Sequence, residues 1–257
     1  MTWFPGHMVD KEFKDLTGNL TGLADGRGAL AALNISDVDR QRHRFTFTDG
    51  TDVPLSDLQR VIPCFTPGTR IATPKGEVAV ERLKVGDRVL TRDNGIKTIR
   101  WFGQKKLDHL QLKTLKELRP VEIKAGALGG GQPERDMKVS PMHRLLVRSD
   151  VARAHFGQSE VFVAAIDLVK LDGISVAEVP YATYVHFMCD HHEVVLSDGT
   201  WSESFQPGDL SLKGMDQQQC EELFGLFPDL AAREGVTQYR PARRTLDRNE
   251  AALLFSL

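Results

Sequence analysis

The stretch that organises the chain is Pro63-Cys64-Phe65-Thr66-Pro67-Gly68-Thr69-Arg70-Ile71, in which a thiol directly follows a peptide carbonyl. The Pro-Gly pair predicts a sharp turn, and the residues after it favour a strand. The Cys64 thiol is therefore placed to act on the bond that precedes it, between Pro63 and Cys64. Such an attack needs thiolate character, a polarised amide, a donor to the carbonyl oxygen and a proton for the departing nitrogen.

A second stretch, Val139-Ser140-Pro141-Met142-His143-Arg144-Leu145, supplies a hydroxyl and an imidazole in S-x-x-H spacing. His143 is a candidate to take the thiol proton or to protonate the amide nitrogen, and Ser140 is a candidate donor to the carbonyl oxygen. Positions three apart on a strand face opposite sides. The two side chains therefore converge only if Pro141 introduces a turn or a bulge.

Each of these signals also has a purely structural interpretation. A lone cysteine is more often a small buried hydrophobe, and a histidine in an apolar run is more often a hydrogen-bonding core residue. The group of Cys189, His191 and His192 does not predict a zinc site, because strand spacing puts the first two on one face and the third on the other. The triple glycine 129–131 lacks the strand-to-helix setting of a phosphate loop. We expect neither a metal nor a cofactor.

Composition excludes several classes of partner. The 257 residues include 41% hydrophobic ones, which is enough for a packed core. The 33 basic and 35 acidic residues leave a net charge of -2, which indicates neither a nucleic-acid partner nor a membrane surface. Three scattered cysteines, at 64, 189 and 220, do not make a disulfide framework, so we expect a reduced thiol at Cys64.

The chain shows no signal peptide and no transmembrane segment. Its most apolar stretch, Val161 to Val169, is short and contains Asp167, whereas a membrane helix needs about 20 apolar residues. We expect a soluble protein that is cytoplasmic at synthesis. Export by a route that reads other signals stays open.

The pattern of strands and turns divides the chain into three parts. Residues 1–63 form a leader with a hairpin near 44–55, where Asp49-Gly50 predicts the turn and Pro54 confines the second strand to an edge. Residues 64–208 form a β domain, and residues 209–257 form a helical tail that packs on the β domain or docks elsewhere. The predicted strands of the β domain cover 69–73, 77–83, 88–91, 96–107 with a bend at Gly103, 121–128, 137–149, 161–169, 181–188 and 193–205.

Helical periodicity in the tail covers 217–227 and 247–254. Asp247 and Glu250 have the spacing of a capping box at the start of the second helix. We therefore predict two helices after the β domain.

Several motifs in a fixed order resemble the Hint superfamily, and among its members the bacterial Hedgehog/intein-type domains. These motifs are Cys64 to Thr69, Leu83-Lys84-Val85-Gly86-Asp87, Ser140 to Arg144, and Asp190-His191-His192-Glu193 followed by Asp198-Gly199 and Glu203-Ser204-Phe205. The resemblance spans about 64–208. It implies an all-β, horseshoe-like fold with pseudo-twofold symmetry and a self-cleavage centre at its cleft. The C-terminal helical appendage is predicted separately, from the periodicity of the tail.

The resemblance also implies roles for individual residues. Cys64 matches the nucleophile, and Ser140 with His143 matches the T-x-x-H pair, with serine in place of threonine. His192 resembles the histidine of the later motif, with His186 and Asp190 as further candidates for the cleft. His191 is expected to face outward.

One departure from the inteins concerns the end of the motif series. Inteins finish with His-Asn, because asparagine cyclisation releases the downstream segment, whereas the asparagine that follows His192 here is Asn249, before Glu250. We therefore expect cleavage at Pro63–Cys64 by an N-to-S acyl shift, then hydrolysis or transfer to water or a small nucleophile, without splicing. This is a single-turnover autocatalytic reaction, not that of a multiple-turnover enzyme.

Two other interpretations stay open. A Hint-fold module that does not cleave and serves in binding or structure is favoured by Pro63, whose ring crowds the carbonyl that sulfur must attack. A cysteine hydrolase acting on other substrates predicts turnover of small esters or thioesters that depends on Cys64.

Overall fold

The computed structural model describes residues 35–39, 44–47, 52–54, 63–207 and 217–255. Three strands of the leader form an antiparallel sheet in the order β1 (Ile35–Asp39), β2 (Arg44–Phe47) and β3 (Asp52–Pro54). β2 and β3 pair as a hairpin, and β3, which ends at Pro54, lies at the sheet edge. The Asp49-Gly50 turn predicted between them lies outside the described residues.

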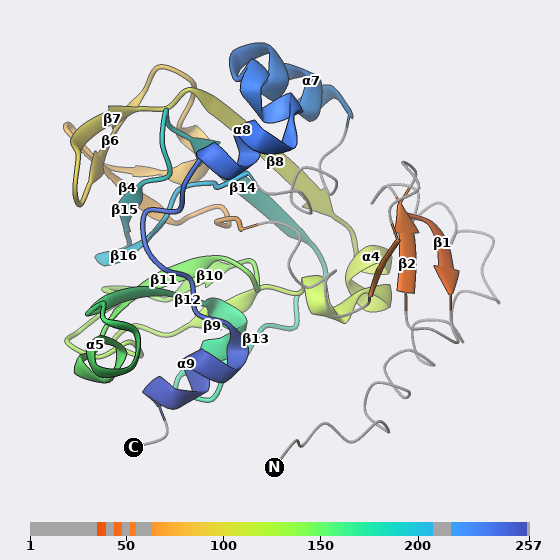
Figure 1. Ribbon diagram of the computed structural model, residues 1–257. Helices are drawn as coiled ribbons and strands as arrows, with labels where there is room; N and C mark the ends of the chain where they lie inside the picture. Colours follow the sequence, from red (N-terminus) through yellow and green to blue (C-terminus); the bar gives the residue numbers. More distant parts are fainter. Residues whose placement is uncertain (1–34, 40–43, 48–51, 55–62, 208–216, 256–257) are drawn as a thin grey trace.

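Between residues 63 and 207 most of the regular elements are β-strands (Figure 1). The largest sheet has the order β12-β11-β16-β15-β4-β5, with β6 pairing with β15 and with β7. Its strands are β4 (Arg70–Thr73), β5 (Gly76–Ala79), β6 (Arg88–Thr91), β7 (Gly95–Thr98), β11 (Arg144–Arg148), β12 (Glu160–Ala164), β15 (Val194–Ser197) and β16 (Thr200–Glu203).

Two smaller sheets complete the β structure. One has the order β10-β9-β13, and the other is a long antiparallel pair of β8 and β14. The strands are β8 (Trp101–Leu107), β9 (Val121–Ile123), β10 (Met137–Val139), β13 (Ile174–Val176) and β14 (Ala182–Met188). Short helical turns connect them: η1 (Val80–Arg82), α4 (His109–Thr114), η2 (Lys116–Leu118), α5 (Asp150–Phe156) and η3 (Ala165–Leu168).

The C-terminal segment adds α7 (Gln217–Leu226), η4 (Pro228–Ala231), α8 (Arg233–Gln238) and α9 (Arg248–Leu254). The two predicted helices are confirmed as α7 and α9. The capping box is also confirmed, because the Asp247 side chain accepts from the backbone of α9 and Glu250 accepts from the backbone N–H of Asp247. α7 and α8 lie near β8 and β14, whereas α9 lies beside α5 (Figure 1).

Both groups of C-terminal helices contribute to the hydrophobic core. Leu246, Ala251 and Leu254 belong to the main buried cluster. Leu223 and Leu230 belong to a second cluster that contains Trp101, Met188 and Phe205. The C-terminal segment is therefore packed into the body of the domain. Over the described ranges, no helix combines the length and the apolar character that spanning a membrane requires.

Three predicted strands are each divided into two in the structure. The single strand predicted over 96–107 is wrong, because β7 ends at Thr98 and β8 begins at Trp101. The linking residues bond to other segments: Ile99 N–H donates to Asp87 O at 2.8 Å, and Arg100 N–H donates to Met188 O at 2.7 Å. The chain therefore changes partner strand between the two halves.

The second interruption forms part of the site. The strand predicted over 137–149 is divided into β10 and β11 by a turn, in which His143 N–H donates to Ser140 O at 3.0 Å. The turn expected at Pro141 is therefore present. In the same way, the stretch 193–205 is a hairpin whose turn residues, Asp198 and Gly199, have φ of 46° and 76°. Asp-Gly is a favoured sequence for this kind of turn.

Candidate functional site

Cys64 lies where the chain joins two strands from different sheets. The following residue, Phe65, forms bridges with Val139 at the end of β10 and with Val185 in β14. Phe65 N–H donates to Val185 O at 2.8 Å, and Val185 N–H donates to Phe65 O at 2.9 Å. Cys64 and Phe65 are both buried. The thiol is therefore fixed beside His186, the next residue of β14.

The backbone of Cys64 is bonded to Ser140 on both sides. Ser140 N–H donates to Cys64 O at 2.9 Å, and Cys64 N–H donates to Ser140 Oγ at 2.8 Å. The hydroxyl thus contacts the nitrogen of the Pro63–Cys64 amide, whereas the sequence suggested a contact with the carbonyl oxygen. Ser140 fixes the orientation of this amide.

The thiol contacts an imidazole. Cys64 Sγ lies 3.2 Å from Nδ1 of His186. Burial, with a smaller contribution from the charge of Lys105, lowers the pKa of His186 to about 3. Burial raises the pKa of the Cys64 thiol well above its ordinary value, although Lys105 acts in the opposite direction. The resting pair is therefore a neutral thiol beside a neutral imidazole.

His143 is close to this pair but is held differently. Its ring packs against Phe65 with centroids 4.3 Å apart, and it is 1% exposed. Neither ring nitrogen has a hydrogen-bond partner within the described part of the chain. Burial lowers the pKa of His143, the nearby Glu203 carboxylate opposes part of this effect, and the resulting pKa is about 4. His143 is therefore a buried, neutral histidine with a free lone pair and a free N–H.

His192, the histidine of the later motif, uses both ring nitrogens in other contacts. Nδ1 accepts from Ala242 N–H at 3.0 Å, and Nε2 lies 3.1 Å from Glu203 Oε2. Because Nδ1 accepts, the ring proton is on Nε2, which donates to the carboxylate. His192 therefore links β16 to the C-terminal segment.

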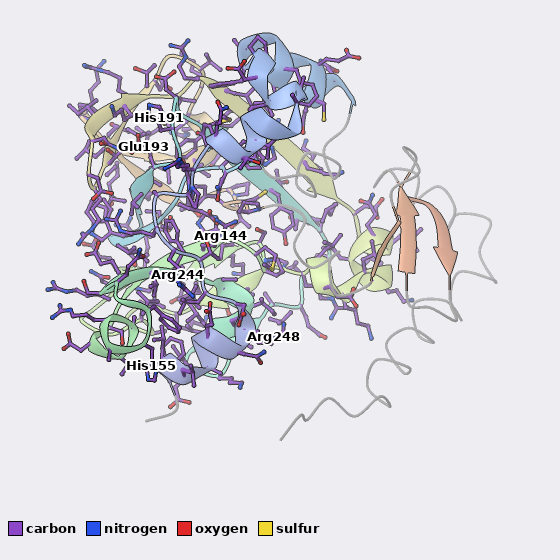
Figure 2. All side chains as sticks on the ribbon, viewed as in Figure 1. Arg144, His155, His191, Glu193, Arg244 and Arg248 are labelled. Carbon is purple, nitrogen blue, oxygen red and sulfur yellow. The ribbon has the colours of Figure 1, made fainter. Side chains whose placement is uncertain are left out.

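Glu203 is a fully buried carboxylate to which the sequence assigned no role. It accepts from Arg144 N–H at 2.8 Å, and Arg144 Nη1 lies 3.2 Å from its other oxygen. Burial raises its pKa, but Arg144 and the two histidines His192 and His143 outweigh that effect, so the pKa is lowered. Arg144 lies toward the middle of the molecule, whereas His155 and Arg248 lie at its edge (Figure 2).

The structure does not bring Asp190 to the thiol. Its side chain is about half exposed and lies 3.5 Å from Arg100 in an ion pair. His191 is exposed, as the sequence indicated. Cys189 is buried, which raises the pKa of its thiol to about 12. Across the residues that the structure describes, no cluster of three metal-ligating side chains is present.

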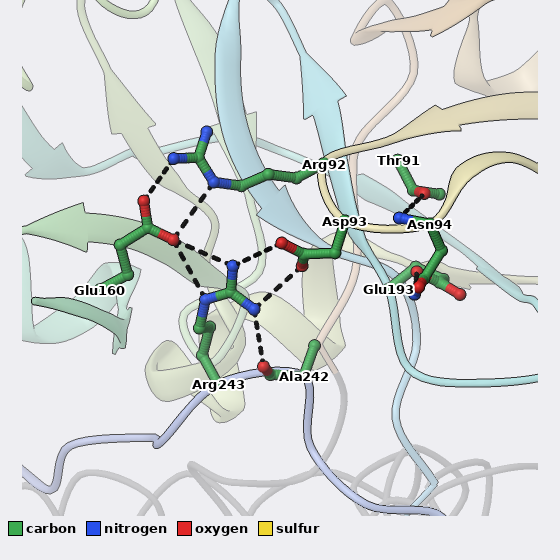
Figure 3. A network of polar contacts seen from close by, with 8 residues as sticks. All are labelled: Thr91, Arg92, Asp93, Asn94, Glu160, Glu193, Ala242 and Arg243. Carbon is green, nitrogen blue, oxygen red and sulfur yellow. Dashed lines mark hydrogen bonds and ion pairs between the residues drawn. The ribbon is translucent and has the colours of Figure 1, made fainter. Parts of the chain in front are cut away.

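The C-terminal segment is held against this region by a strap, residues 239–246. Tyr239 OH donates to Cys189 O at 2.9 Å, and Thr245 bridges to Phe162 in β12. Between these points, Arg243 reaches the carboxylates of Asp93 and Glu160 at 2.8 and 2.9 Å, and Arg92 also contacts Glu160 (Figure 3). The strap thus joins β12 to the β6–β7 turn.

The comparisons with known proteins agree with this architecture. The sequence model of the Hint domain matches residues 63–209, more than half of the chain. No curated protein shows a significant match.

Solved structures of inteins and intein-like domains are similar at low identity. The bacterial intein-like domain from Clostridium thermocellum is 18% identical, with a TM-score of 0.34, over 55% of this chain and 97% of that one. A DnaB intein from Synechocystis sp. PCC 6803 is 11% identical, with a TM-score of 0.36, over 55% and 98%.

The mostly β architecture and the match over residues 63–209 define a domain of the self-processing type. The chain belongs to the Hint domain family.

Proposed function

We propose that the chain cleaves its own Pro63–Cys64 bond by an N-to-S acyl shift, followed by hydrolysis of the thioester or transfer to a small nucleophile. Residues 1–63 are released, and residues 64–257, including the tail 209–257, stay together. One observation carries the proposal: Cys64 Sγ lies 3.2 Å from His186 Nδ1 while Ser140 Oγ holds the N–H of the amide to be broken.

The first step forms one bond and breaks another. Sγ attacks the carbonyl carbon of Pro63 through a five-membered ring, and the thiol proton passes to Nδ1 of His186. The C–N bond then breaks, and the nitrogen takes up a proton as it becomes the free amine of Cys64. The net change moves the thiol proton to the amine and the acyl group to sulfur.

The neighbouring groups match these proton movements. The burial that raises the pKa of Cys64 keeps the thiol protonated until a base accepts its proton, and His186 is the base in contact with it. His143 is the candidate to pass this proton on to the nitrogen, because both its ring nitrogens lack hydrogen-bond partners in the described residues and its ring packs on Phe65. The neutral His143 ring takes up the proton that His186 removed from the thiol as it gives one to the nitrogen, so both histidines end neutral. The charge of Lys105 favours anionic sulfur.

Absence of splicing is part of the same proposal. Glu193 directly follows His192, and the asparagine that comes after His192 in the sequence is Asn249, before Glu250. Asn249 lies in the first turn of α9, where its N–H donates to Asp247 Oδ1 at 2.8 Å. Cyclisation of Asn249 would have to disrupt this capped turn. His192 is bonded to Glu203 and Ala242, which supports a structural role for it.

Intact-mass spectrometry of freshly purified and aged protein tests the proposal, with and without added thiol or hydroxylamine. We expect masses for residues 1–63 and 64–257, and faster cleavage with the added nucleophile. Cys64→Ala should stay whole, whereas Cys220→Ala, which removes another thiol, should cleave like the parent. A parent chain that stays whole even with hydroxylamine would refute self-cleavage.

A second function, a Hint-fold module that does not cleave, is favoured by the complete burial of Cys64 and its raised thiol pKa. It predicts an intact chain whose Cys64 is alkylated only after unfolding. The same mass spectra, recorded after iodoacetamide treatment of the folded and urea-unfolded protein, separate the two functions.

A further inference from the structure

The pair of β8 and β14 presents one face to the thiol. Its register places His186 opposite Gly103, Met188 opposite Trp101 and Tyr184 opposite Lys105. Directly opposed residues of an antiparallel pair point to the same side. The backbone of Gly103 therefore lies beneath the His186 ring.

Space, not backbone conformation, accounts for the glycine at position 103. A Cβ there would lie 2.5 Å from Cη2 of Trp101 and 2.6 Å from Nε2 of His186. Its φ does not fall in the left-handed region, so an L residue fits the backbone but not the space. The two rings occupy the volume that a side chain at 103 would fill.

Three aromatic rings meet above this glycine. His186 stacks on Trp101 with centroids 5.1 Å apart and planes at 22°, and Phe205 lies 5.3 Å from the imidazole. Trp101, His186 and Phe205 are at most 2% exposed. We call Trp101, Gly103 and Phe205 together the imidazole seat. Their packing limits how the His186 ring can turn.

We propose that Gly103 and Trp101 are positioning residues that orient His186 so that Nδ1 reaches the thiol of Cys64. The effect of this orientation on cleavage rests on the proposed function, because only a reacting thiol needs an oriented base. Contact between Sγ and Nδ1 at 3.2 Å requires the ring to face Cys64 with that nitrogen, and a side chain at 103 would displace the opposite edge of the ring. Such small displacements of a reacting group slow reactions by up to about 100-fold.

Gly103→Ala tests the seat, and Gly225→Ala in α7 is its matched control, because a Cβ there meets nothing within 4 Å. The first readout is the ¹⁵N spectrum of the histidine rings, which reports the tautomer and hydrogen bonding of His186 whether or not the chain cleaves. The second is the cleavage rate. We expect Gly103→Ala to change the His186 ring signals and slow cleavage roughly 10- to 100-fold, whereas Gly225→Ala changes neither.

Two further variants cover the case in which Gly103→Ala does not fold. Trp101→Phe keeps an aromatic contact but removes the indole atoms nearest to position 103, and we expect altered His186 signals with slower cleavage. Adding Trp101→Phe to Gly103→Ala should restore part of the folded protein and part of the parent His186 signals, which a loss of stability alone would not do.

The outcomes separate the two proposals. Changed His186 ring signals in Gly103→Ala, together with a parent chain that never cleaves, would support the seat and refute self-cleavage. Unchanged ring signals in Gly103→Ala, or in Trp101→Phe if the first variant is unfolded, would overturn the seat even in a chain that cleaves.

Discussion

Because His143 and His186 are buried in their neutral form, we predict that the protein loses stability in mild acid. The pKa of His143 is lowered from 6.5 to about 4 and that of His186 from 6.5 to about 3, both mainly by burial. Below pH 6.5 the unfolded chain binds protons at these positions that the folded chain does not. The stabilisation is therefore fully present above pH 6.5 and is lost as the pH falls.

The size of this loss of stability follows from the pH interval between the ordinary histidine pKa of 6.5 and the lowered pKa values. Each pH unit corresponds to about 1.4 kcal/mol per histidine, so at pH 5 each contributes a loss of about 2 kcal/mol. The two together lower the free energy of unfolding by about 4 kcal/mol, a large part of the 5–15 kcal/mol typical of a domain. Above pH 5 the lowered pKa of Glu203 adds little, because that carboxylate is charged in both states.

Urea unfolding at several pH values between 7 and 5 measures this loss, in a Cys64→Ala background that keeps the chain whole. We expect His143→Gln with His186→Gln to flatten the pH dependence while lowering stability at pH 7. His155→Gln, at an exposed position, should leave the slope unchanged. A free energy of unfolding that is constant from pH 7 to pH 5, or a slope that persists in the double variant, would refute the reasoning.

Two further predictions concern the strap. Arg243→Met removes ion pairs with two carboxylates at a partly buried position. Thermal unfolding should therefore show a free energy of unfolding that is lower by about 1–2 kcal/mol, and this loss should shrink in high salt. Arg240→Met, at an exposed position, should change the free energy of unfolding little. His192→Ala removes a buried ring that uses both nitrogens in hydrogen bonds. We expect urea unfolding to show a free energy of unfolding lower by about 2–4 kcal/mol, against less than about 0.5 kcal/mol for His191→Ala at an exposed position. Equal losses in the two variants would contradict the structural role of His192.

Much of the fold could be predicted because the local signals are strong. Turn residues mark most strand ends, and the Asp247–Glu250 spacing marks the start of α9. The split between β7 and β8 could not be predicted, because it depends on Ile99 and Arg100 bonding to segments distant in the sequence. The apolar periodicity of the sequence is continuous across Ile99 and Arg100, and it carries no information about which strands pair.

The site shows the same limit. Cys64 and the Ser140–His143 turn could be found from sequence, since a proline in a strand pattern requires a turn or a bulge. That His186, rather than His192, is the neighbour of the thiol could not be predicted, because it depends on the bridge from Phe65 to Val185. Gly103 looked like the bend of a strand, and only the pairing register shows that it lies under a histidine ring.

The hydrogen bonds that hold Cys64 also determine the direction of the proposed reaction. Ser140 Oγ and the bridge of Phe65 to Val185 are positioned to keep the new amine beside the thioester after the C–N bond breaks. An amine held in this way has an effective concentration that reaches about 10⁵ M or more. It therefore competes with water for the acyl group and re-forms the original amide. The thioester is then a minor species in equilibrium with the intact chain, and the yield of cleaved protein is set by how fast an external nucleophile captures it.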